Sequence, residues 1–319
     1  MRRLPVALTV IALASVALVG CSSSSDPAAS CPRVTDANSP TMAQIQVAGP
    51  TTSKPIVDVD APLHTTTTQF KDVTRGDGAV PISSAKQMVV LDVALVSATT
   101  GKPLVATAYN GDQTQAVPLD RWATQFPAFV DALHCATAGT RVALAIAPGG
   151  LEASSAQNLG LGPKDSLVAV VDVRRVYLGA ANGALVYNSG WGMPAVVRAA
   201  DGRPGVVIRD AAAPQNLKIW TLKRGDGEKV TGDAPVMVNY TIVNWTDKAV
   251  ADTTWDSTPQ AITLSDKSKG FRDAVEGQTV GSQVMAVIPK IDGSPDAKDT
   301  QVAVIDILGI APKAAAPAQ

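Results

Sequence analysis

The stretch KDSLVAVVD at residues 164–172 decides the expected fold, because it recurs as KDTQVAVID at residues 298–306. Two further blocks recur ahead of it in the same order. They are RGDG at residues 75–78 and 224–227, and FVDA at 129–132, which returns as FRDA at 271–274. Three matched blocks in one order are hard to obtain by chance, and they indicate two copies of a single unit.

Each copy is made mostly of short apolar runs that are typical of β-strands. The runs follow glycine-containing turns or end at a proline, and one short helical pattern interrupts them. A strand-rich unit of about a hundred residues with a single helix predicts an α+β fold, in which one antiparallel sheet wraps around one short helix. Segments 32–70 and 184–222 add strands ahead of each copy. The predicted strands include 88–96, 141–147, 236–243 and 282–288, and the predicted helices lie at 127–133 and 268–275.

The first twenty residues have the pattern of a secretory signal peptide. Arg2 and Arg3 supply a positive end, and residues 4–19 form an apolar run shorter than the roughly 20 residues that a membrane-spanning helix needs. The sequence LVGC at residues 18–21 resembles the lipobox of bacterial lipoproteins. That resemblance implies a lipid on Cys21 and an exported protein anchored to the outer face of the bacterial cell membrane. The alternative is an ordinary secretory signal followed by an incidental cysteine.

These patterns divide the chain into five expected parts. A serine-rich stretch after Cys21 is typical of a flexible tether, and an Ala/Pro-rich stretch at the other end is typical of a disordered tail. The expected parts are the signal peptide (1–20), the lipid-anchored tether (21–31), the first domain (32–183), the second domain (184–310) and the tail (311–319).

The charge pattern excludes nucleic acid as a partner. The sequence has 27 lysines and arginines and 28 aspartates and glutamates, and loss of Arg2 and Arg3 with the signal peptide leaves a net charge of −3. No basic cluster is longer than the pair Arg174-Arg175. Binding to nucleic acid, or to a membrane through a polybasic patch, is therefore not expected.

The cysteines and histidines predict a disulfide and no metal site. Once Cys21 carries a lipid, a disulfide between Cys31 and Cys135 is the simple expectation in an oxidising compartment, and two separate buried thiols are the alternative. The two histidines, His64 and His134, lie in different contexts without a partner pattern. No CxxC pair, Walker loop or dinucleotide-binding fingerprint occurs, so no metal and no cofactor are expected.

Several motifs of the second copy resemble those of FKBP-type peptidyl-prolyl isomerases. VMVNYT at residues 236–241 is similar to the family pattern V-x-V-x-Y-T-G, and VADTTW at 250–255 is similar to V-F-D-S-S-W. The resemblance covers residues 217–310 well and 67–178 more weakly. Further matches are GFRDAV at 270–275, GQTVGS at 277–282, VIP at 287–289 and VIDIL at 304–308.

This resemblance implies a peptidyl-prolyl cis-trans isomerase of two FKBP-like domains that acts, as a monomer, on proline-containing segments of exported polypeptides. The barrier to rotation about a peptide bond is roughly 18–20 kcal/mol because resonance keeps the amide planar. An apolar pocket disfavours the polar planar amide relative to the twisted transition state. The resemblance makes Tyr240 a hydrogen-bond donor to a substrate carbonyl, Asp252 the pocket carboxylate and Phe271 the pocket floor. The implied walls are Trp255, Ile262 and Ile288.

The second copy departs from the family pattern at positions that would weaken its activity. Ala251 replaces the family phenylalanine, Ile242 replaces a glycine, and Lys267-Ser268 stand where the family has Val-Ile. The loop after Pro289 is short and lacks the family's Tyr-Gly. An alternative register takes Asp256 as the pocket carboxylate. The number of residues that separates Asp252 from Tyr240 fits the family pattern better, and this spacing favours Asp252.

The first copy lacks the implied site. Alignment of the motifs places Asp92 at the position of Tyr240 and Ala106 at that of Asp252, and it retains only the phenylalanine, Phe129. A structural or binding module is the expected role of this copy. The alternative for the whole chain is a weak or inactive FKBP-like scaffold or chaperone that holds extended peptides. The two functions differ in what they need, because a chaperone requires only exposed apolar surface.

Overall fold

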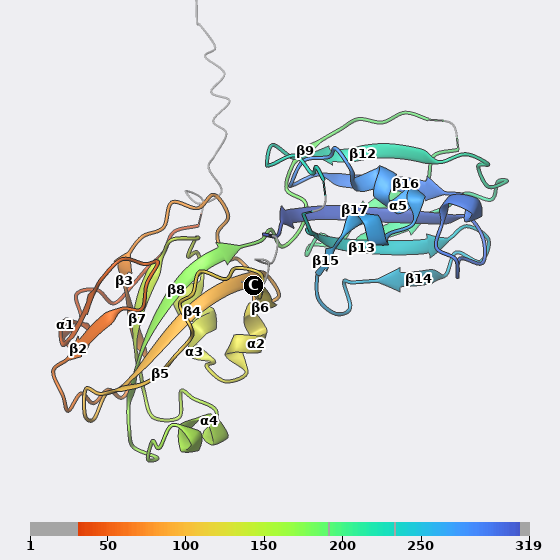
Figure 1. The fold of residues 1–319 in the computed structure, drawn as a ribbon. Helices are drawn as coiled ribbons and strands as arrows, with labels where there is room; N and C mark the ends of the chain where they lie inside the picture. Colours follow the sequence, from red (N-terminus) through yellow and green to blue (C-terminus); the bar gives the residue numbers. More distant parts are fainter. Residues whose placement is uncertain (1–30, 191, 233, 313–319) are drawn as a thin grey trace, which may run out of the picture.

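The computed structural model describes residues 31–190, 192–232 and 234–312, and these form two antiparallel β-sheets that lie side by side (Figure 1). We call residues 31–183 the first half and residues 184–312 the second half. The predicted signal peptide, the lipid anchor Cys21, the tether up to residue 30 and the tail beyond residue 312 lie outside the described residues. None of the described helices combines the length and the apolar character that crossing a bilayer requires.

The first half contains a six-stranded sheet and a separate two-stranded hairpin. The hairpin precedes the sheet in the chain, as the extra strands predicted for segment 32–70 require. In chain order, the elements are α1 (Pro40–Ala43), β1 (Ile45–Ala48), β2 (Ile56–Val59), β3 (Gln69–Thr74), β4 (Met88–Ser97), β5 (Pro103–Ala106), β6 (Val117–Pro118), α2 (Leu119–Ala123), α3 (Ala128–Leu133), β7 (Arg141–Ile146), α4 (Ala153–Asn158) and β8 (Leu167–Val176).

The second half contains a seven-stranded sheet and another separate hairpin. In chain order, the elements are β9 (Ala184–Leu185), β10 (Ala195–Arg198), β11 (Pro204–Val207), β12 (Lys218–Arg224), β13 (Val236–Asn244), β14 (Val250–Thr253), β15 (Gln260–Ile262), the 3₁₀ turn η1 (Leu264–Asp266), α5 (Lys269–Val275), β16 (Gln283–Ile288), the 3₁₀ turn η2 (Lys290–Asp292) and β17 (Gln301–Ile310).

The two sheets have the same strand order, as the sequence repeats predict. In the first half the order is β3-β7-β8-β4-β5, with β6 also paired to β4. In the second half the order is β12-β16-β17-β13-β14, with β15 also paired to β13 and β9 added beyond β12. The repeated blocks KDSLVAVVD and KDTQVAVID begin just before the central strands, β8 and β17. The repeat therefore extends from sequence to topology.

The repeated RGDG block follows a strand in both halves and lets two backbone segments approach closely. A Cβ atom on Gly76 would lie 2.1 Å from the carbonyl oxygen of Ala138, and one on Gly225 would lie 2.0 Å from that of Val280. Neither distance is compatible with any residue except glycine. The block is thus a structural feature of the fold, at the point where the first strand of each sheet ends.

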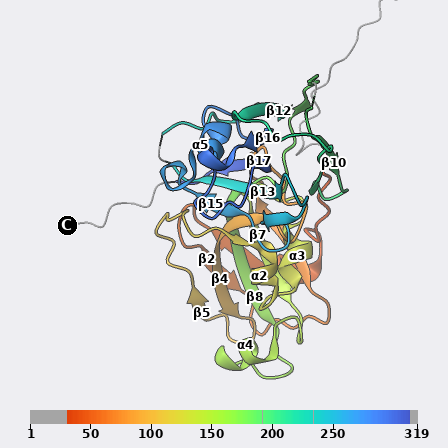
Figure 2. The ribbon, with the colours of Figure 1, turned by 90° about the vertical axis from the view of Figure 1, so that its right-hand side faces the viewer.

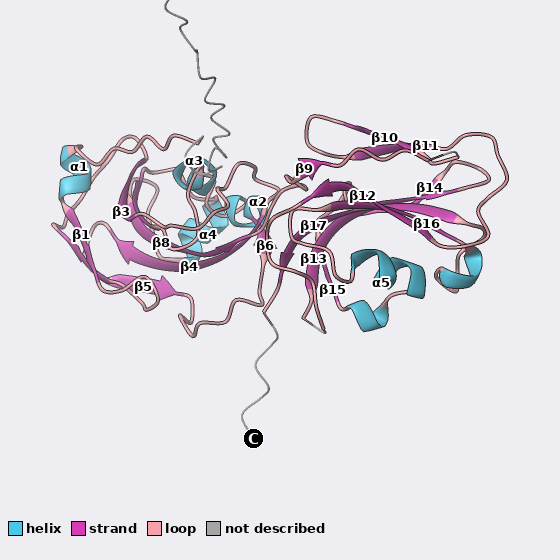
Figure 3. Ribbon diagram, turned by 90° about the horizontal axis from the view of Figure 1, so that it is seen from above, coloured by secondary structure: helices cyan, strands magenta, loops and turns pink. Residues whose placement is uncertain are grey.

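Each sheet packs one face against a short helix. In the first half Phe129 and Leu133 of α3 enter a core formed by alternate residues of β4, β7 and β8. In the second half Phe271 and Val275 of α5 do the same with β13, β16 and β17. Figure 3 shows that the hairpin β10–β11 covers the opposite face of the second sheet from α5. In the first half, Met42, Ile45 and Val59 from α1 and the hairpin β1–β2 pack on the other face of the sheet, against Val168 of β8. Both central strands are therefore covered on two faces, which explains their unbroken apolar runs.

The expectation of one short helix in each copy is wrong for the first half, where the structure has four helices. The helix α2 brings Leu119 and Trp122 to the core and is separated from α3 by Pro127, which begins a new helix. The helix α4 forms in the longer loop between β7 and β8, where the Glu152 side chain accepts a hydrogen bond from the Ser155 backbone N–H. Figure 2 shows α4 at the lower end of the first half.

The link between the halves is bonded to both of them. The Tyr177 N–H donates to the Met88 carbonyl in the first half, and the next N–H, that of Leu178, donates to the Leu308 carbonyl in the second half. The buried side chains of Met88, Tyr177, Met237 and Leu308 form one small cluster. The link is consequently held from both sides by hydrogen bonds and by apolar contact.

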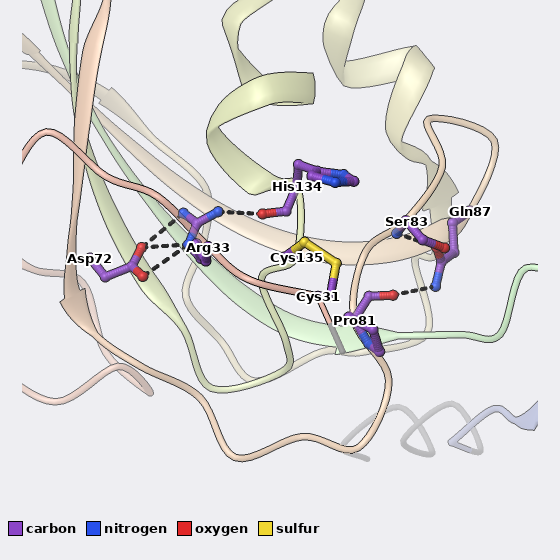
Figure 4. Close-up of a disulfide and its surroundings, with 8 residues drawn as sticks. All are labelled: Cys31, Arg33, Asp72, Pro81, Ser83, Gln87, His134 and Cys135. Carbon is purple, nitrogen blue, oxygen red and sulfur yellow. Dashed lines mark hydrogen bonds and ion pairs between the residues drawn. A yellow bond between two sulfur atoms is a disulfide. The ribbon is translucent and has the colours of Figure 1, made fainter. Parts of the chain in front are cut away.

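A disulfide joins Cys31 to Cys135, the pair that the sequence predicts (Figure 4). The two Cα atoms are 5.5 Å apart and 104 residues apart in sequence. Nearby, the Arg33 guanidinium donates to the carboxylate of Asp72 at 2.8 Å and to the backbone carbonyl of His134. The disulfide and the bond to His134 fasten the beginning of the described chain to the loop that follows α3, and the ion pair with Asp72 fastens it to β3.

Loss of this disulfide should destabilise the first half. We expect Cys135→Ser to lower the free energy of unfolding by roughly 2–5 kcal/mol, because the bridge closes a loop of about a hundred residues in the unfolded chain. Urea denaturation of the variant and the wild type measures the difference. Alkylation of the unreduced chain starting at residue 22 should label neither cysteine, and labelling of both would contradict the pairing.

Candidate functional site

The candidate site is built around Tyr240, in the middle of β13. Along this strand Val236, Val238 and Tyr240 face α5, whereas Asn239 faces away, as the alternation of a β-strand requires. Only 6% of Tyr240 is exposed. The strand therefore presents one phenol to the space between the sheet and the helix.

The hydroxyl of Tyr240 donates a hydrogen bond to Asp252 Oδ2 at 2.8 Å. Asp252 lies on the edge strand β14 opposite Ile242, so its carboxylate reaches diagonally across the pair of strands to the phenol. Burial of the phenol, followed by the hydrogen bond and the charge of Asp252, raises the pKa of Tyr240 far above its ordinary value. The phenol is thus protonated at neutral pH and donates its hydrogen bond to Asp252.

Phe271 forms the floor beside this pair. It lies in α5, and its ring contacts the Tyr240 ring edge to face with the centroids 5.6 Å apart. The residue before it is Gly270, and a side chain at this position would not fit, because an added Cβ would lie 2.4 Å from a methyl carbon of Ile288. This close approach brings α5 onto β16 and places Phe271 and Ile288 together.

These residues line an open pocket of about 270 Å³. Ile242, Phe271 and Ile288 give the pocket an apolar surface beside the phenol and the carboxylate, and the rest of the lining includes polar side chains. This combination suits the binding of a prolyl amide, a substrate that needs no nucleophile for its isomerisation. Of the six predicted site residues of the second half, four line the pocket. They are Tyr240, Asp252, Phe271 and Ile288.

The prediction that Trp255 and Ile262 are pocket walls is wrong. After β14 the Thr254 N–H donates to the Tyr240 carbonyl, and this turn directs Trp255 to the other side of the sheet, against the first half. Ile262 pairs with Val236 at the far end of β13 and is buried in the core. The alternative carboxylate, Asp256, is bound by an exposed Arg203 and does not line the pocket.

Sequence reasoning did not assign several residues that complete the pocket. Lys267 and Ser268 line it immediately before α5, and they are the residues at which the sequence departs from the family pattern. That departure was the available signal, because a polar pair at an expected apolar position marks a changed wall. The remaining lining residues come from β13, η1, the loop after β16 and the start of β17: Ile242, Asp266, Gly293, Ser294, Pro295 and Gln301.

The register of the two sheets corrects the equivalence assigned to Tyr240. Asp92 lies opposite Asp172, just as Asn239 lies opposite Asp306 in the repeated block, so Asp92 corresponds to Asn239. The counterpart of Tyr240 is Val93, one residue later. A shift of one residue moves a side chain to the opposite face of a strand, which explains why the alignment of motifs placed a carboxylate in the wrong layer.

The counterpart of Asp252 is also shifted by one residue. Val105 lies opposite Leu95, just as Asp252 lies opposite Ile242, so Val105 and not Ala106 holds the equivalent position. Neither Val93 nor Val105 has a polar side chain. The inference that the first half lacks the donor and the carboxylate therefore holds with different residues.

Aromatic side chains cover the equivalent phenylalanine of the first half. The ring of Phe129 is stacked on Phe126 with the centroids 4.8 Å apart, and Trp122 of α2 lies 6.4 Å from it. Phe129 is fully buried, whereas Phe271 borders a pocket. The helix α2 thus fills space that the second half leaves open.

One group of potential metal ligands occurs among the described residues. The Sγ atoms of Cys31 and Cys135 lie within 4.8 Å of an imidazole nitrogen of His134, but both sulfurs belong to the disulfide. A disulfide sulfur carries no thiolate to offer to a metal. The other histidine of the chain, His64, is exposed and does not belong to this group.

No protein family and no curated protein matches the chain. The solved structures that resemble it include the three FKBP domains of wheat FKBP73, at 14% identity and a TM-score of 0.31 over 76% of this chain and 94% of that one. They also include a peptidyl-prolyl cis-trans isomerase from Pseudomonas syringae, at 21% identity and a TM-score of 0.27 over 30% and 76%.

A third similar structure is a putative peptidyl-prolyl cis-trans isomerase, FKBP12, from Mycobacterium tuberculosis. It is 27% identical over 30% of this chain and 86% of that one, with a TM-score of 0.25. TM-scores of this size do not assign the chain to a family.

Proposed function

We propose that the chain is a peptidyl-prolyl cis-trans isomerase whose active cleft lies in the second half. The observation that carries this proposal is the hydrogen bond of 2.8 Å between Tyr240 and Asp252 at the edge of a pocket walled by Phe271 and Ile288. Four residues that the resemblance to FKBP-type isomerases singles out thus meet in one place, although they come from four separate elements.

In this proposal the pocket acts through solvation and shape. The prolyl ring packs against Phe271 and Ile288, and the apolar surroundings disfavour the planar amide, which is more polar than the twisted one. Asp252 accepts a hydrogen bond from the Tyr240 hydroxyl and so fixes the direction of the hydroxyl before the substrate binds. A substrate carbonyl that enters the pocket competes for that proton. No covalent step is needed.

A proline-isomerisation assay on the full chain tests the proposal, with Asp252→Ala and Phe271→Ala as the site variants. Each variant is expected to lower kcat/KM at least tenfold.

We propose the clients to be proline-containing segments of exported polypeptides. We also propose that the halves are two domains, residues 32–183 and 184–310, and that the chain is monomeric.

A second candidate function is a chaperone or scaffold that holds extended peptides without catalysis. The observation that favours it is an apolar pocket of about 420 Å³ in the first half, between α4 and the loop after β7. Leu151, Leu161 and Leu167 line it, and none of its lining residues reproduces the pair of phenol and carboxylate. Under this alternative, suppression of aggregation of an unfolded client would persist in the Phe271→Ala variant.

We propose that the protein is exported and held at the outer face of the cell membrane by a lipid on Cys21. The sequence LVGC at residues 18–21 supports this proposal. The disulfide of Cys31 and Cys135 is consistent with an oxidising compartment.

Replacement of Cys21 should abolish anchoring. We expect Cys21→Ser to leave an unprocessed precursor or to release the protein, because the thioether to the lipid requires the thiol. Fractionation of cells and the mass of the mature N-terminus measure the outcome, and Ser22→Ala is the matched control. A processed Cys21→Ser protein that remains in the membrane fraction would show that the lipid is attached elsewhere.

A further inference from the structure

A groove of about 390 Å³ lies between the two halves, on the other side of the sheet from the proposed active cleft. Its size falls within the range of ordinary ligand sites, which often occur where two domains meet. The first half contributes Pro81, and the second half contributes Trp255 and Pro259. An indole and two proline rings give the groove apolar walls.

Asn239 places an unused hydrogen-bond donor in this groove. The residue lines the groove and is 5% exposed. The Thr254 hydroxyl accepts the Tyr240 N–H and donates its own proton to Asn239 Oδ1 at 2.9 Å. This relay fixes the orientation of the amide, so Nδ2 is the end that remains. In the described part of the chain, Nδ2 donates to no acceptor.

A second donor at the groove lacks an acceptor as well. The Nε1 atom of Trp255 is buried and has no hydrogen-bond partner in the described part of the chain. Of the two donors, Nε1 is the one that is fully buried without a partner, and such a donor costs free energy. The indole would have to rotate before Nε1 could reach a ligand. Asn239 therefore supplies the hydrogen-bond donor of the groove, and Trp255 contributes its ring as a wall.

We infer that this groove binds a proline-rich segment of another polypeptide in the polyproline II conformation. Such a segment turns its carbonyl oxygens outward and has no internal hydrogen bonds, and its prolines bring no N–H groups that would need acceptors. Grooves that recognise it combine aromatic and proline walls with a few donors. Carbonyl oxygens supply what Asn239 Nδ2 lacks, and pyrrolidine rings fit the walls that Pro81, Trp255 and Pro259 form.

Occupancy of the groove would be felt at the proposed active cleft. Thr254 bonds Asn239 on one side and the backbone of Tyr240 on the other, through its hydroxyl at 2.9 Å and its N–H at 3.1 Å. Asp252 lies only two residues before Thr254. A ligand that pulls on Asn239 therefore acts on the strand that positions the phenol and the carboxylate. Binding itself does not depend on isomerase activity.

Fluorescence anisotropy with labelled decaproline and the full chain starting at residue 22 tests the inference. We expect saturable binding, and no saturable binding of a labelled Gly/Ser decamer. Asn239→Asp should weaken binding at least tenfold, because a carboxylate repels carbonyl oxygens. Ser257→Trp, at the exposed rim, should abolish binding by filling the groove, whereas Ser189→Trp, exposed outside it, should bind like the wild type.

Binding in the active cleft is distinguished by Asp252→Ala, which should retain decaproline binding. Three outcomes would overturn the inference. They are no saturable decaproline binding to the wild type, equal binding of the Gly/Ser decamer, and loss of binding in Asp252→Ala with retention in Ser257→Trp. Failure of the isomerase assay would leave the inference intact, because anisotropy reads binding alone.

Discussion

Phe271→Ala is expected to lower kcat/KM for prolyl isomerisation at least tenfold, a loss of about 1.4 kcal/mol or more of transition-state stabilisation. The ring is the floor of the pocket and contacts Tyr240 edge to face. Its removal widens the pocket and admits water beside the amide, so the planar ground state is solvated again. The same ring is buried, so the variant should also lose about 3–5 kcal/mol of stability.

The loss of stability must be separated from the loss of activity. Assays should be run where circular dichroism shows that Phe271→Ala is folded, and Phe271→Leu should serve as a variant that keeps most of the buried volume. Tyr240→Phe keeps the ring and removes only the hydroxyl that donates to Asp252. Full turnover by folded Phe271→Ala would place the active cleft elsewhere in the chain.

Arg141→Met is expected to destabilise the protein by about 3–5 kcal/mol, the cost of leaving a buried charge without its partner. Arg141 is fully buried, and it forms two hydrogen bonds with the Asp172 carboxylate at 2.7 and 2.9 Å. Two of its nitrogens also donate to carbonyls of the loop between β1 and β2: Nη1 to that of Gly49, and Nη2, which bonds Asp172 as well, to that of Ser53. Methionine keeps the volume and loses every one of these bonds.

This loss of stability should depend on pH. Burial already raises the pKa of Asp172 despite the opposing effect of Arg141, and removal of Arg141 takes away the main force that lowers it. In the variant the folded state therefore prefers a protonated Asp172. The penalty should be small below the ordinary pKa of an aspartate and should grow as the pH rises toward the raised folded value. Urea denaturation of both proteins from pH 3 to pH 8 measures this trend.

The double variant Arg141→Met/Asp172→Leu is the control for this prediction. It removes both charges and should recover most of the lost stability, since the penalty arises from the unpaired carboxylate. Equal destabilisation in the double variant would show that the bonds to the loop, and not the buried charge, dominate. The second half has no such arginine, because Gln283 takes its place and donates to Asp306.

The two copies and their main strands were predictable from the sequence, because the repeats and the apolar runs follow from burial. A central strand covered on both faces must be apolar throughout, so β8 and β17 were visible in the sequence. The helix α2 was missed although Leu119, Trp122 and Phe126 have helical spacing, because it is only five residues long and its segment is bounded by prolines at 118 and 127. The role of Trp122 and Phe126 depends on Phe129, which they cover in the folded chain.

Two features of the site could not be predicted from motifs alone: the residue equivalence between the two halves and the side of the sheet on which Trp255 lies. The strands β4 and β13 share a register irregularity at equivalent positions, between Val90 and Leu91 and between Met237 and Val238, so it does not displace the alignment. The displacement arises ahead of these strands, because the offset between the copies is 149 residues at the RGDG block and 147 residues at Val93 and Tyr240. An error of one residue is enough to exchange the two faces of a sheet. The face of the sheet on which Trp255 lies depends on the hydrogen bond from the Thr254 N–H to the Tyr240 carbonyl, and no local sequence pattern predicts that bond.

The most direct test of the proposed active cleft compares Asp252→Ala with its structural counterpart in the first half, Val105→Ala. Both residues lie on exposed edge strands, so neither change should unfold the chain. The measurement is kcat/KM of the full chain for a proline-containing peptide. Catalysis by the wild type that falls at least tenfold in Asp252→Ala and is unchanged in Val105→Ala would agree with the proposal. No catalysis by the wild type, or catalysis lost in Val105→Ala and kept in Asp252→Ala, would contradict it.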